Sequence, residues 1–272
     1  MEFAIVEGQR RAPFHGGRGL CQTCGSLLIA KCGPRVMHSW AHWGRRQCDP
    51  WWENETSWHR SWKGLFPEDC REVVHVAADD EIHRADIRTP TGIYVEVQHS
   101  AITDAERLSR EQFYGNLVWV IDAAPFRKNF DIFHVLPHPD SALAADLIWY
   151  KSKREMQGAA GGIFLRLSEC QAECPEVTKT SHRGGWVYGI DRIREQVHDA
   201  YVGHHQYDWI RPRRTWLDAT CPVFIDFGRD MLGRLDLYDG YLPCIQLMGK
   251  RDFVQAVMTH DDVRQIGRRS AP

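Results

Sequence analysis

The stretch HRADIRTPTGIYVEVQHS, His83 to Ser100, has the pattern of a β-hairpin and carries two acidic residues that would face each other. Its two arms alternate apolar and polar residues with the period of a half-buried strand, and the TPTG between them has the composition of a turn. Pairing the apolar residues on one face sets Asp86 opposite Glu96, because a one-residue slip would invert a face. Opposed carboxylates repel each other. The hairpin therefore predicts a counter-charge, which is either a divalent metal ion or the neighbouring Arg84 and Arg88.

The residues before the hairpin predict a helix that adds two candidate ligands. Asp49-Pro50 is a typical helix start, and residues 51–66 have helical spacing. Glu55 and His59 are four apart and would share one face of that helix. Magnesium and manganese prefer carboxylate oxygen, and manganese also accepts imidazole. These two residues and the hairpin acids therefore form a candidate site for Mg²⁺ or Mn²⁺. The alternatives are a packed or surface histidine and a solvated hairpin with arginine-paired acids.

The order of several motifs resembles a known nuclease family. The motifs are Glu55-x3-His59, Arg84-Ala-Asp86, Glu96-Val97-Gln98-His99-Ser100, Arg110-x3-Tyr114 and the strand LVWVID at 117–122. In this order they resemble the competence protein CoiA-like family, which is assigned to the PD-(D/E)XK nuclease superfamily. A second match, CQTCGSLLIAKCGPRVMHSWAH at 21–42, resembles the small zinc-ribbon-like module of that family. The combination is more specific than any one motif.

The resemblance implies an α/β fold with a mixed sheet, a restriction-endonuclease-like PD-(D/E)XK core, and a set of roles. Asp86 and Glu96 would bind the catalytic ion, and the Val97 carbonyl would complete its shell. His59 would be an upstream metal ligand, and Glu55 a metal-shell or water-orienting residue. Substrate-binding roles would fall to Arg84, Arg110, Tyr114 and Ser100.

Two of these roles have open alternatives. Gln98 stands where many members of the superfamily have lysine, and a neutral amide can hydrogen-bond the attacking water but cannot deprotonate it. The general base is therefore unassigned. Arg110 would otherwise pair with Glu106 or Glu111, and Tyr114 would otherwise belong to the core.

The N-terminal cysteines predict a zinc site. Cys21-x2-Cys24 and His38-x3-His42 are ligand pairs separated by a short loop, which is a zinc spacing. Zinc would hold together a segment too short to bury a core of its own. The alternative is a set of reduced, unliganded cysteines. The predicted ligands are Cys21, Cys24 and His42, followed by His38 and then by Cys48 or Cys32 as the fourth.

Composition bounds the class of protein. A chain of 272 residues with 43% hydrophobic residues fits one or two domains. The polar first twenty residues and the absence of a long apolar run predict neither a signal peptide nor a membrane helix. Nine cysteines with irregular spacing favour thiols and metal ligands in a reducing cytoplasm.

The net charge of −2 means that any DNA-binding surface must be local. The arginine cluster at 211–214, flanked by Trp209 and Trp216, suits phosphate contacts combined with base stacking. The other basic candidates are Arg10 with Arg11 and Arg45 with Arg46.

The sequence predicts three parts: a zinc module at 1–48, a nuclease core at 49–157 and a C-terminal α/β region at 158–272. Within them, 103–115 and 141–157 predict helices and 117–122 a buried strand. The predicted protein is a divalent-metal-dependent deoxyribonuclease that processes incoming or foreign DNA in competence, recombination or defence. The alternatives are a DNA-binding accessory factor without catalysis and an adaptor that binds a protein partner.

Overall fold

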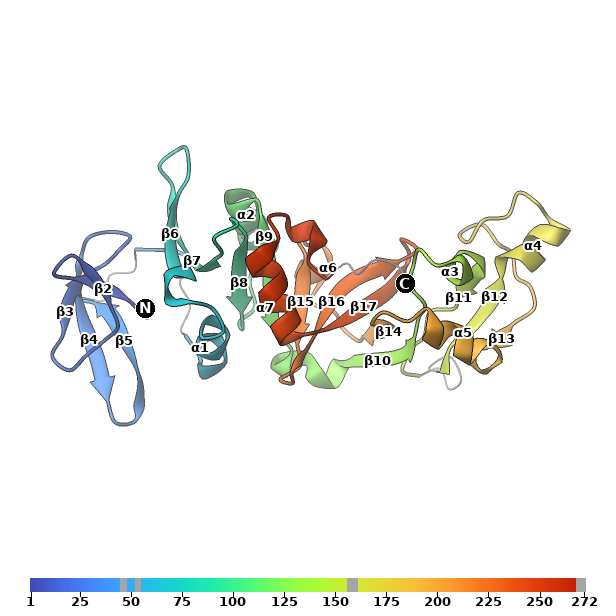
Figure 1. Ribbon diagram of the computed structural model, residues 1–272, viewed down its shortest axis with the longest axis horizontal. Helices are drawn as coiled ribbons and strands as arrows, with labels where there is room; N and C mark the ends of the chain where they lie inside the picture. Colours follow the sequence, from blue (N-terminus) through green and yellow to red (C-terminus); the bar gives the residue numbers. More distant parts are fainter. Residues whose placement is uncertain (45–47, 52–54, 156–160, 268–272) are drawn as a thin grey trace. The chain divides into compact units, whose positions relative to one another are not determined.

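A computed structural model of the chain describes residues 1–44, 48–51, 55–155 and 161–267 and shows a mixed α/β protein (Figure 1). The chain divides into two compact units. The first contains Met1–Ile121, Ala219–Cys221 and Val254–Val263, and the second contains the rest. The three-part division of the sequence is finer than these two units and stays a prediction.

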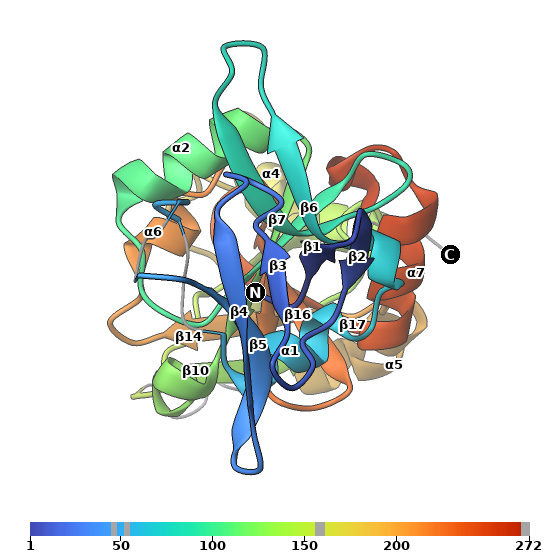
Figure 2. The same ribbon diagram turned by 90° about the vertical axis from the view of Figure 1, so that its left-hand side faces the viewer.

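An antiparallel five-stranded sheet forms the N-terminal part of the first unit (Figure 2). Its strand order is β2-β1-β3-β4-β5. Trp40 and Leu28 are buried beside Cys21 on one face of this sheet, so the sheet packs its small core around the cysteines. The strands are β1 (Ala4–Val6), β2 (Gln9–Arg11), β3 (Arg18–Leu20), β4 (Leu27–Gly33) and β5 (Val36–His42).

A mixed α/β layer follows in the same unit. Its four strands lie in the order β9-β8-β7-β6. The pair β8 and β9 is parallel, whereas the other pairs are antiparallel. Between β8 and β9 the chain passes through α2, which is the usual way to connect parallel strands. The elements in chain order are α1 (Ser57–Lys63), η1 (Glu68–Cys70), β6 (Arg71–Val76), β7 (Ile82–Arg88), β8 (Tyr94–Gln98), α2 (Asp104–Tyr114) and β9 (Leu117–Asp122).

The helix and strand predicted at 103–115 and 117–122 are confirmed as α2 and β9. Thr103 caps α2, because its hydroxyl accepts a hydrogen bond from the Glu106 amide at 3.1 Å. Gly115, with a φ of +67°, ends the helix. Every residue of β9 is buried, as its continuous apolar run predicts.

The second unit has five antiparallel strands in the order β10-β14-β17-β16-β15 and a small sheet in the order β11-β12-β13. A core that includes Leu136, Trp149, Phe164 and Tyr238 packs between its elements. The strands are β10 (Phe130–Val135), β11 (Leu147–Trp149), β12 (Ile163–Arg166), β13 (Tyr188–Gly189), β14 (His204–Trp209), β15 (Val223–Asp226), β16 (Met231–Tyr238) and β17 (Leu242–Gly249). The helices that follow β9 in the chain are η2 (Ala124–Asn129), α3 (Ala142–Asp146), α4 (Leu167–Glu173), η4 (Ile190–Ile193), α5 (Arg194–Asp199), α6 (Arg214–Leu217), α7 (Lys250–Thr259) and η5 (Val263–Gln265). Residues 254–263, which include most of α7, belong to the first unit.

The helix predicted at 141–157 is much shorter than expected. Ser141 caps it, as predicted, but α3 ends at Asp146. The apolar residues that follow form β11, which pairs with β12 and buries Trp149 in the core. Residues 156–160 lie outside the described part. Pairing with a distant strand thus outweighs local helical spacing here. Within the described ranges, no helix is both long and apolar enough to cross a membrane.

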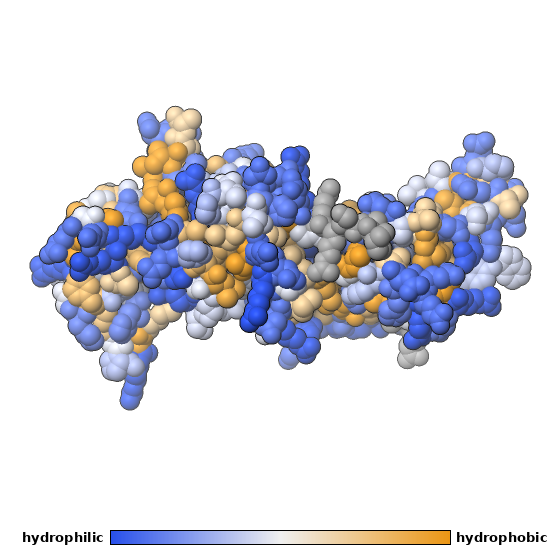
Figure 3. Space-filling view, in the orientation of Figure 1, coloured by the Kyte–Doolittle hydropathy of each residue, from blue (hydrophilic) through white to orange (hydrophobic). Residues whose placement is uncertain are grey.

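The hairpin of β6 and β7 exposes apolar side chains at its far end (Figure 3). Val76 and Ile82 face each other across the two strands and are 53% and 37% exposed. The opposite end of the same hairpin is buried, and it carries the acidic site.

Candidate active site and metal cluster

The hairpin of β7 and β8 brings Asp86 and Glu96 together. Ile87 pairs with Val95, and Asp86 and Glu96 are the next residues on the two strands. At these two residues, main-chain amides donate hydrogen bonds to side-chain carboxylates of the opposite strand. The Asp86 amide donates to Glu96 Oε1 at 3.1 Å, and the Val97 amide donates to Asp86 Oδ2 at 3.0 Å. Each carboxylate is therefore held by the backbone of the opposite strand.

The polar face of this hairpin is not solvated, although its alternating pattern predicts a half-buried strand. Every residue of β8 is buried, and Glu96 and Gln98 are only 5% and 3% exposed. Helix α1 lies against β8. It contributes the side chains of His59 and Lys63, which line the same pocket as the acids. The acids therefore lie in a medium of low polarity, where their charges need partners.

The partners of the two acids are His59 and Arg110. His59 Nε2 lies 2.8 Å from Asp86 Oδ1. Arg110 donates to Glu96 Oε2 at 3.1 Å and to Glu106 Oε1 at 2.5 Å. The predicted helical pairing of Arg110 with Glu106 is therefore present together with a contact to the acid pair.

The pKa values of the two acids are shifted in opposite directions. Burial raises the pKa of Glu96, and the adjacent Asp86 carboxylate raises it further, to about 8. Burial also acts to raise the pKa of Asp86, but the charge and hydrogen bond of His59 lower it below its usual value. Burial acts to lower the pKa of His59, and Asp86 raises it above the usual value. The contacts of Asp86 therefore favour its ionised form, whereas burial and the neighbouring carboxylate favour the protonated form of Glu96.

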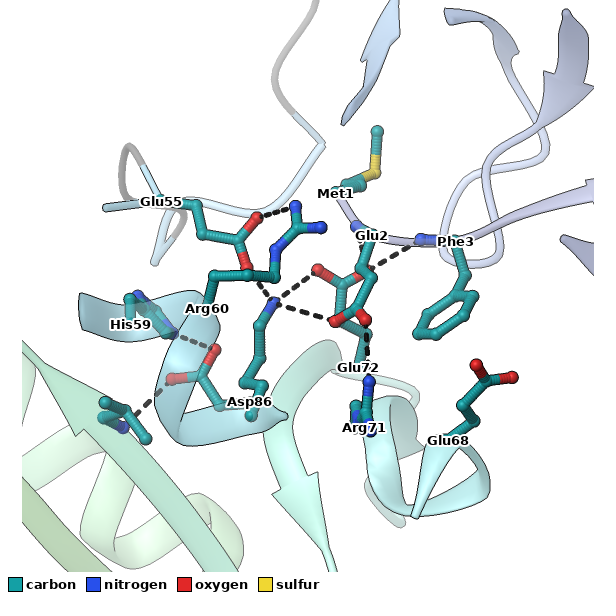
Figure 4. A network of polar contacts seen from close by, with 12 residues as sticks. Met1, Glu2, Phe3, Glu55, His59, Arg60, Glu68, Arg71, Glu72 and Asp86 are labelled. Carbon is teal, nitrogen blue, oxygen red and sulfur yellow. Dashed lines mark hydrogen bonds and ion pairs between the residues drawn. The ribbon is translucent and has the colours of Figure 1, made fainter. Parts of the chain in front are cut away.

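A second charge network, centred on Lys63, lies close to Asp86. Figure 4 labels two of its acids, Glu55 and Glu72, together with Asp86. Lys63 is 2% exposed, and its Nζ lies 2.5 Å from Glu55 Oε1 and 2.9 Å from Glu72 Oε1. The Glu72 carboxylate also accepts from the amides of Glu2 at 2.8 Å and Phe3 at 3.3 Å. Burial acts to lower the pKa of Lys63, but Glu72, Asp86 and Glu55 raise it above the usual value.

Sequence analysis missed Lys63 and Glu72. Lys63 follows His59 by four residues, so the helical spacing that singled out His59 also places Lys63 on its face. Glu72 has no such signal, because it reaches the network from another element, β6. Its backbone adopts a φ of +46°, a left-handed conformation that is rare outside glycine.

Glu55 occupies the pocket but not the helix. The predicted helix at 51–66 begins only at Ser57, and residues 52–54 lie outside the described part. Thr56 is the N-cap, since its hydroxyl accepts from the His59 amide at 3.1 Å. The Glu55 carboxylate, which precedes the cap, contacts Lys63 and Arg60, each at 2.5 Å.

Asp49, the predicted helix start, instead binds the first residues of β7. Its Oδ1 accepts from the Trp51 amide at 3.0 Å and lies 2.9 Å from His83 Nδ1. Its Oδ2 accepts from the Arg84 amide at 3.0 Å. Both oxygens are thus occupied by β7 and the local turn.

These side chains surround a small cavity of about 50 Å³. Gln98 lines it, and its Nε2 donates to the Ser100 carbonyl at 3.2 Å. The exposed side chain of Ser100 is not part of the lining. Tyr114 lines the cavity with 6% exposure and stacks on Tyr94 at 4.7 Å between ring centroids, so it is both a core and a pocket residue. The lining also includes Asp49, Trp51, Glu55, Glu72, Arg84, Asp86, Glu96 and Arg110.

A Cys/His cluster forms at the edge of the five-stranded sheet. The ligand atoms of Cys21, Cys24, His42 and Cys48 all lie within 4.8 Å of one another. The Cys21 and Cys48 sulfurs are 3.7 Å apart, and Cys24 Sγ lies 3.4 Å from His42 Nε2. A tetrahedral zinc with bonds of about 2.3 Å to sulfur and about 2.05 Å to nitrogen separates its ligands by about 3.8 Å and about 3.6 Å. The four residues could therefore bind a zinc ion.

Two thiols of the cluster lie close enough for one to shift the pKa of the other. Burial raises the pKa of the Cys48 thiol to about 12, and the neighbouring Cys21 contributes to this rise. The turn between the first two cysteines is closed by Gly25, whose amide donates to the Cys21 carbonyl at 2.9 Å. Its φ of +66° favours glycine at this position.

His38, predicted ahead of Cys48 as the fourth ligand, lies outside the four-residue cluster, and Cys48 is the fourth member instead. His38 and His42 are both on β5. Residues four apart on a strand are separated by about 13 Å, whereas on a helix they are neighbours. The His38 ring instead lies 6.0 Å from that of His15.

The basic and aromatic cluster at 209–216 is not an exposed stacking surface. Trp209 and Trp216 are 5% and 3% exposed. Trp209 packs against Phe126, with ring centroids 4.6 Å apart, so it belongs to the core of the second unit. Arg10 donates to the carbonyls of Glu68 and Arg71. Arg45 and Arg46 lie outside the described residues.

A scan of the chain against protein-family models found no match. Searches among curated proteins and among solved structures also found no match.

Proposed function

We propose that this chain is a metal-dependent nuclease that hydrolyses phosphodiester bonds in DNA, with Asp86 and Glu96 holding a Mg²⁺ or Mn²⁺ ion. The observation that carries the proposal is the pair of adjacent carboxylates, in which burial and the charge of Asp86 raise the pKa of Glu96 to about 8. A divalent cation would relieve the repulsion between the two carboxylates. Mg²⁺ characteristically binds through one or two carboxylates and keeps several waters, so two acids are a sufficient protein contribution.

The order of elements supports the superfamily assignment. Residues 57–122 run α1-β6-β7-β8-α2-β9, and the acids lie on the central antiparallel pair. This is the arrangement that the resemblance to the CoiA-like family implies for a PD-(D/E)XK core. The Cys/His cluster supports the accompanying zinc module, in which we propose a structural Zn²⁺.

The side chains of the pocket would have different roles. A bound ion would polarise the phosphoryl oxygen and lower the pKa of a water molecule. His59 would hold the Asp86 carboxylate, and Arg110 would hold the Glu96 carboxylate, in the positions needed to bind that ion. Lys63 does not replace the lysine that is absent at Gln98 as a base, because its carboxylate partners keep it protonated.

Cleavage assays on single- and double-stranded DNA with Mg²⁺ or Mn²⁺ test this proposal. Asp86→Asn and Glu96→Gln should both reduce cleavage to background. The matched control is Glu195→Gln, which removes an exposed acid in the second unit and should cleave like the wild type. Circular dichroism would verify the fold of each variant. Metal-independent cleavage, or full activity in both acid variants, would refute the assignment.

One observation favours the alternative of a DNA-binding accessory factor. Both acids already have protein partners, since His59 contacts Asp86 and Arg110 contacts Glu96. A site neutralised in this way could persist without a metal. DNA binding that weakens steeply with salt, combined with no cleavage under any metal condition, would support this reading over the nuclease.

A further inference from the structure

The four described residues 48–51 lie between the Cys/His cluster and both acids of the pocket. Cys48 is a member of the cluster. The next residue, Asp49, binds β7, and Trp51 contacts the arginine that holds Glu96. We call residues 48–51 the connecting segment.

The first connection runs through Asp49 to Asp86. The Asp49 carboxylate accepts from the Arg84 amide at 3.0 Å and lies 2.9 Å from His83 Nδ1. Arg84 is two residues before Asp86 on β7. Main-chain pairing between β7 and β8 includes Ile87 and Arg88. Asp86 is held to β8 through hydrogen bonds of the two carboxylates. The hydrogen bond from the Arg84 amide to Asp49 therefore fixes β7 just before Asp86.

The second connection runs through Trp51 to Glu96. The Trp51 carbonyl accepts from Arg110 at 2.9 Å, and the same guanidinium donates to Glu96 Oε2 at 3.1 Å. The Trp51 ring also stacks on His83, with centroids 3.3 Å apart. Displacing the connecting segment would therefore disturb the strand that carries Asp86 and the arginine that contacts Glu96.

We infer that the connecting segment couples the metal occupancy of the Cys/His cluster to the divalent-cation affinity of the Asp86–Glu96 pocket, with Asp49 as the positioning residue. This inference rests on the proposed function, since it assigns a regulation to the same pocket. When a zinc ion is bound by the four residues of the cluster, it fixes Cys48 and thus the start of the connecting segment. A cluster that has lost its metal releases Cys48, so Asp49 and Trp51 hold the pocket less firmly.

Mn²⁺ titration of the full chain tests the coupling. Calorimetry would measure the Mn²⁺ dissociation constant of wild type with zinc bound and after zinc has been chelated and the chelator removed. The expected result is affinity at least fivefold weaker without zinc. Asp49→Ala with zinc bound should show a loss of the same size, and zinc removal should then add less than twofold. Asp86→Asn identifies the binding that belongs to the pocket.

The matched control is Ser141→Ala. It also removes a side-chain acceptor of a main-chain amide, at 3.1 Å, but it lies in the second unit. It should retain the wild-type dependence on zinc. Equal Mn²⁺ affinity of wild type with and without zinc would overturn the inference. Retention of the full zinc dependence in Asp49→Ala would also overturn it.

Amide hydrogen exchange separates this inference from the proposed function. Zinc removal should accelerate exchange in peptides that contain Arg84 and Val97 in wild type, but not in peptides from β16. Asp49→Ala should show the faster rates with zinc bound. If Mn²⁺ does not bind wild type at all, the proposed function is refuted. The exchange rates then decide whether zinc in the cluster stabilises the pocket strands. Unchanged rates after zinc removal would refute the coupling.

Discussion

Replacing Lys63 with methionine should destabilise the protein by about 3 kcal/mol, because it leaves buried carboxylates without their cation. Removing one partner of a buried ion pair costs about 3–5 kcal/mol. Lys63 is 2% exposed and contacts Glu55 and Glu72 at 2.5 and 2.9 Å. Each acid keeps another partner, since Arg60 binds Glu55 and two main-chain amides bind Glu72. We therefore expect the lower end of that range.

Chemical denaturation followed by circular dichroism would measure this loss, and thermal unfolding should show a fall in Tm of about 10 °C. The double variant Lys63→Met with Glu72→Gln should recover part of the loss, because it removes a charge of each sign. Arg194→Ala is the control, since its pair with Asp191 is exposed and should contribute at most about 1 kcal/mol. A loss below about 1 kcal/mol for Lys63→Met, or a double variant as unstable as the sum of the singles, would refute the reasoning.

Three further predictions concern the cluster, the acid pair and the second unit. Cys48→Ser should lower the zinc content measured by metal analysis, whereas His38→Ala should retain one zinc per chain; the opposite pattern would reject the ligand set. The wild-type free energy of unfolding should fall as pH rises from about 5 to about 9, because the raised pKa of Glu96 makes the folded state hold its proton longer than the unfolded state. Glu96→Gln should abolish that part of the fall, and identical pH profiles would contradict the assignment. Gly233→Ala should cost about 1–3 kcal/mol in denaturation, because its Cβ would lie 2.0 Å from a buried isoleucine side chain; Gly189→Ala, which meets open space, should cost far less.

The hairpin register was predictable because local rules determine it. Apolar residues at every second position and a TPTG turn leave one pairing that buries a single apolar set. The observed pair of Ile87 and Val95 has this register, and Asp86 and Glu96 are the next residues along the two strands. The same reasoning located α2 and β9, where a capping threonine and a continuous apolar run act within a few residues.

Other features depend on contacts between distant segments, which no local pattern contains. Whether His38 can join His42 depends on whether that segment is a strand or a helix, and spacing alone cannot decide this. The Lys63–Glu72 pair joins α1 to β6, and its carboxylate is held by amides of residues 2 and 3. The alternating pattern of β8 predicts a solvated face, but α1 lies against that strand and its residues are buried.

The electrostatics of the pocket bear on our proposal that Asp86 and Glu96 hold a divalent cation. His59 offsets the charge of Asp86, so the pKa of Asp86 stays below the usual value. Arg110 does not offset burial and repulsion at Glu96, whose pKa remains raised to about 8. A raised carboxyl pKa lowers stability at and above neutral pH, when the carboxyl must ionise in the folded state. A protein that only bound DNA would be more stable with a neutral residue at this position. A second carboxylate that lacks a full complement of positive charge is instead what a divalent-cation site requires, since the ion itself supplies the missing charge.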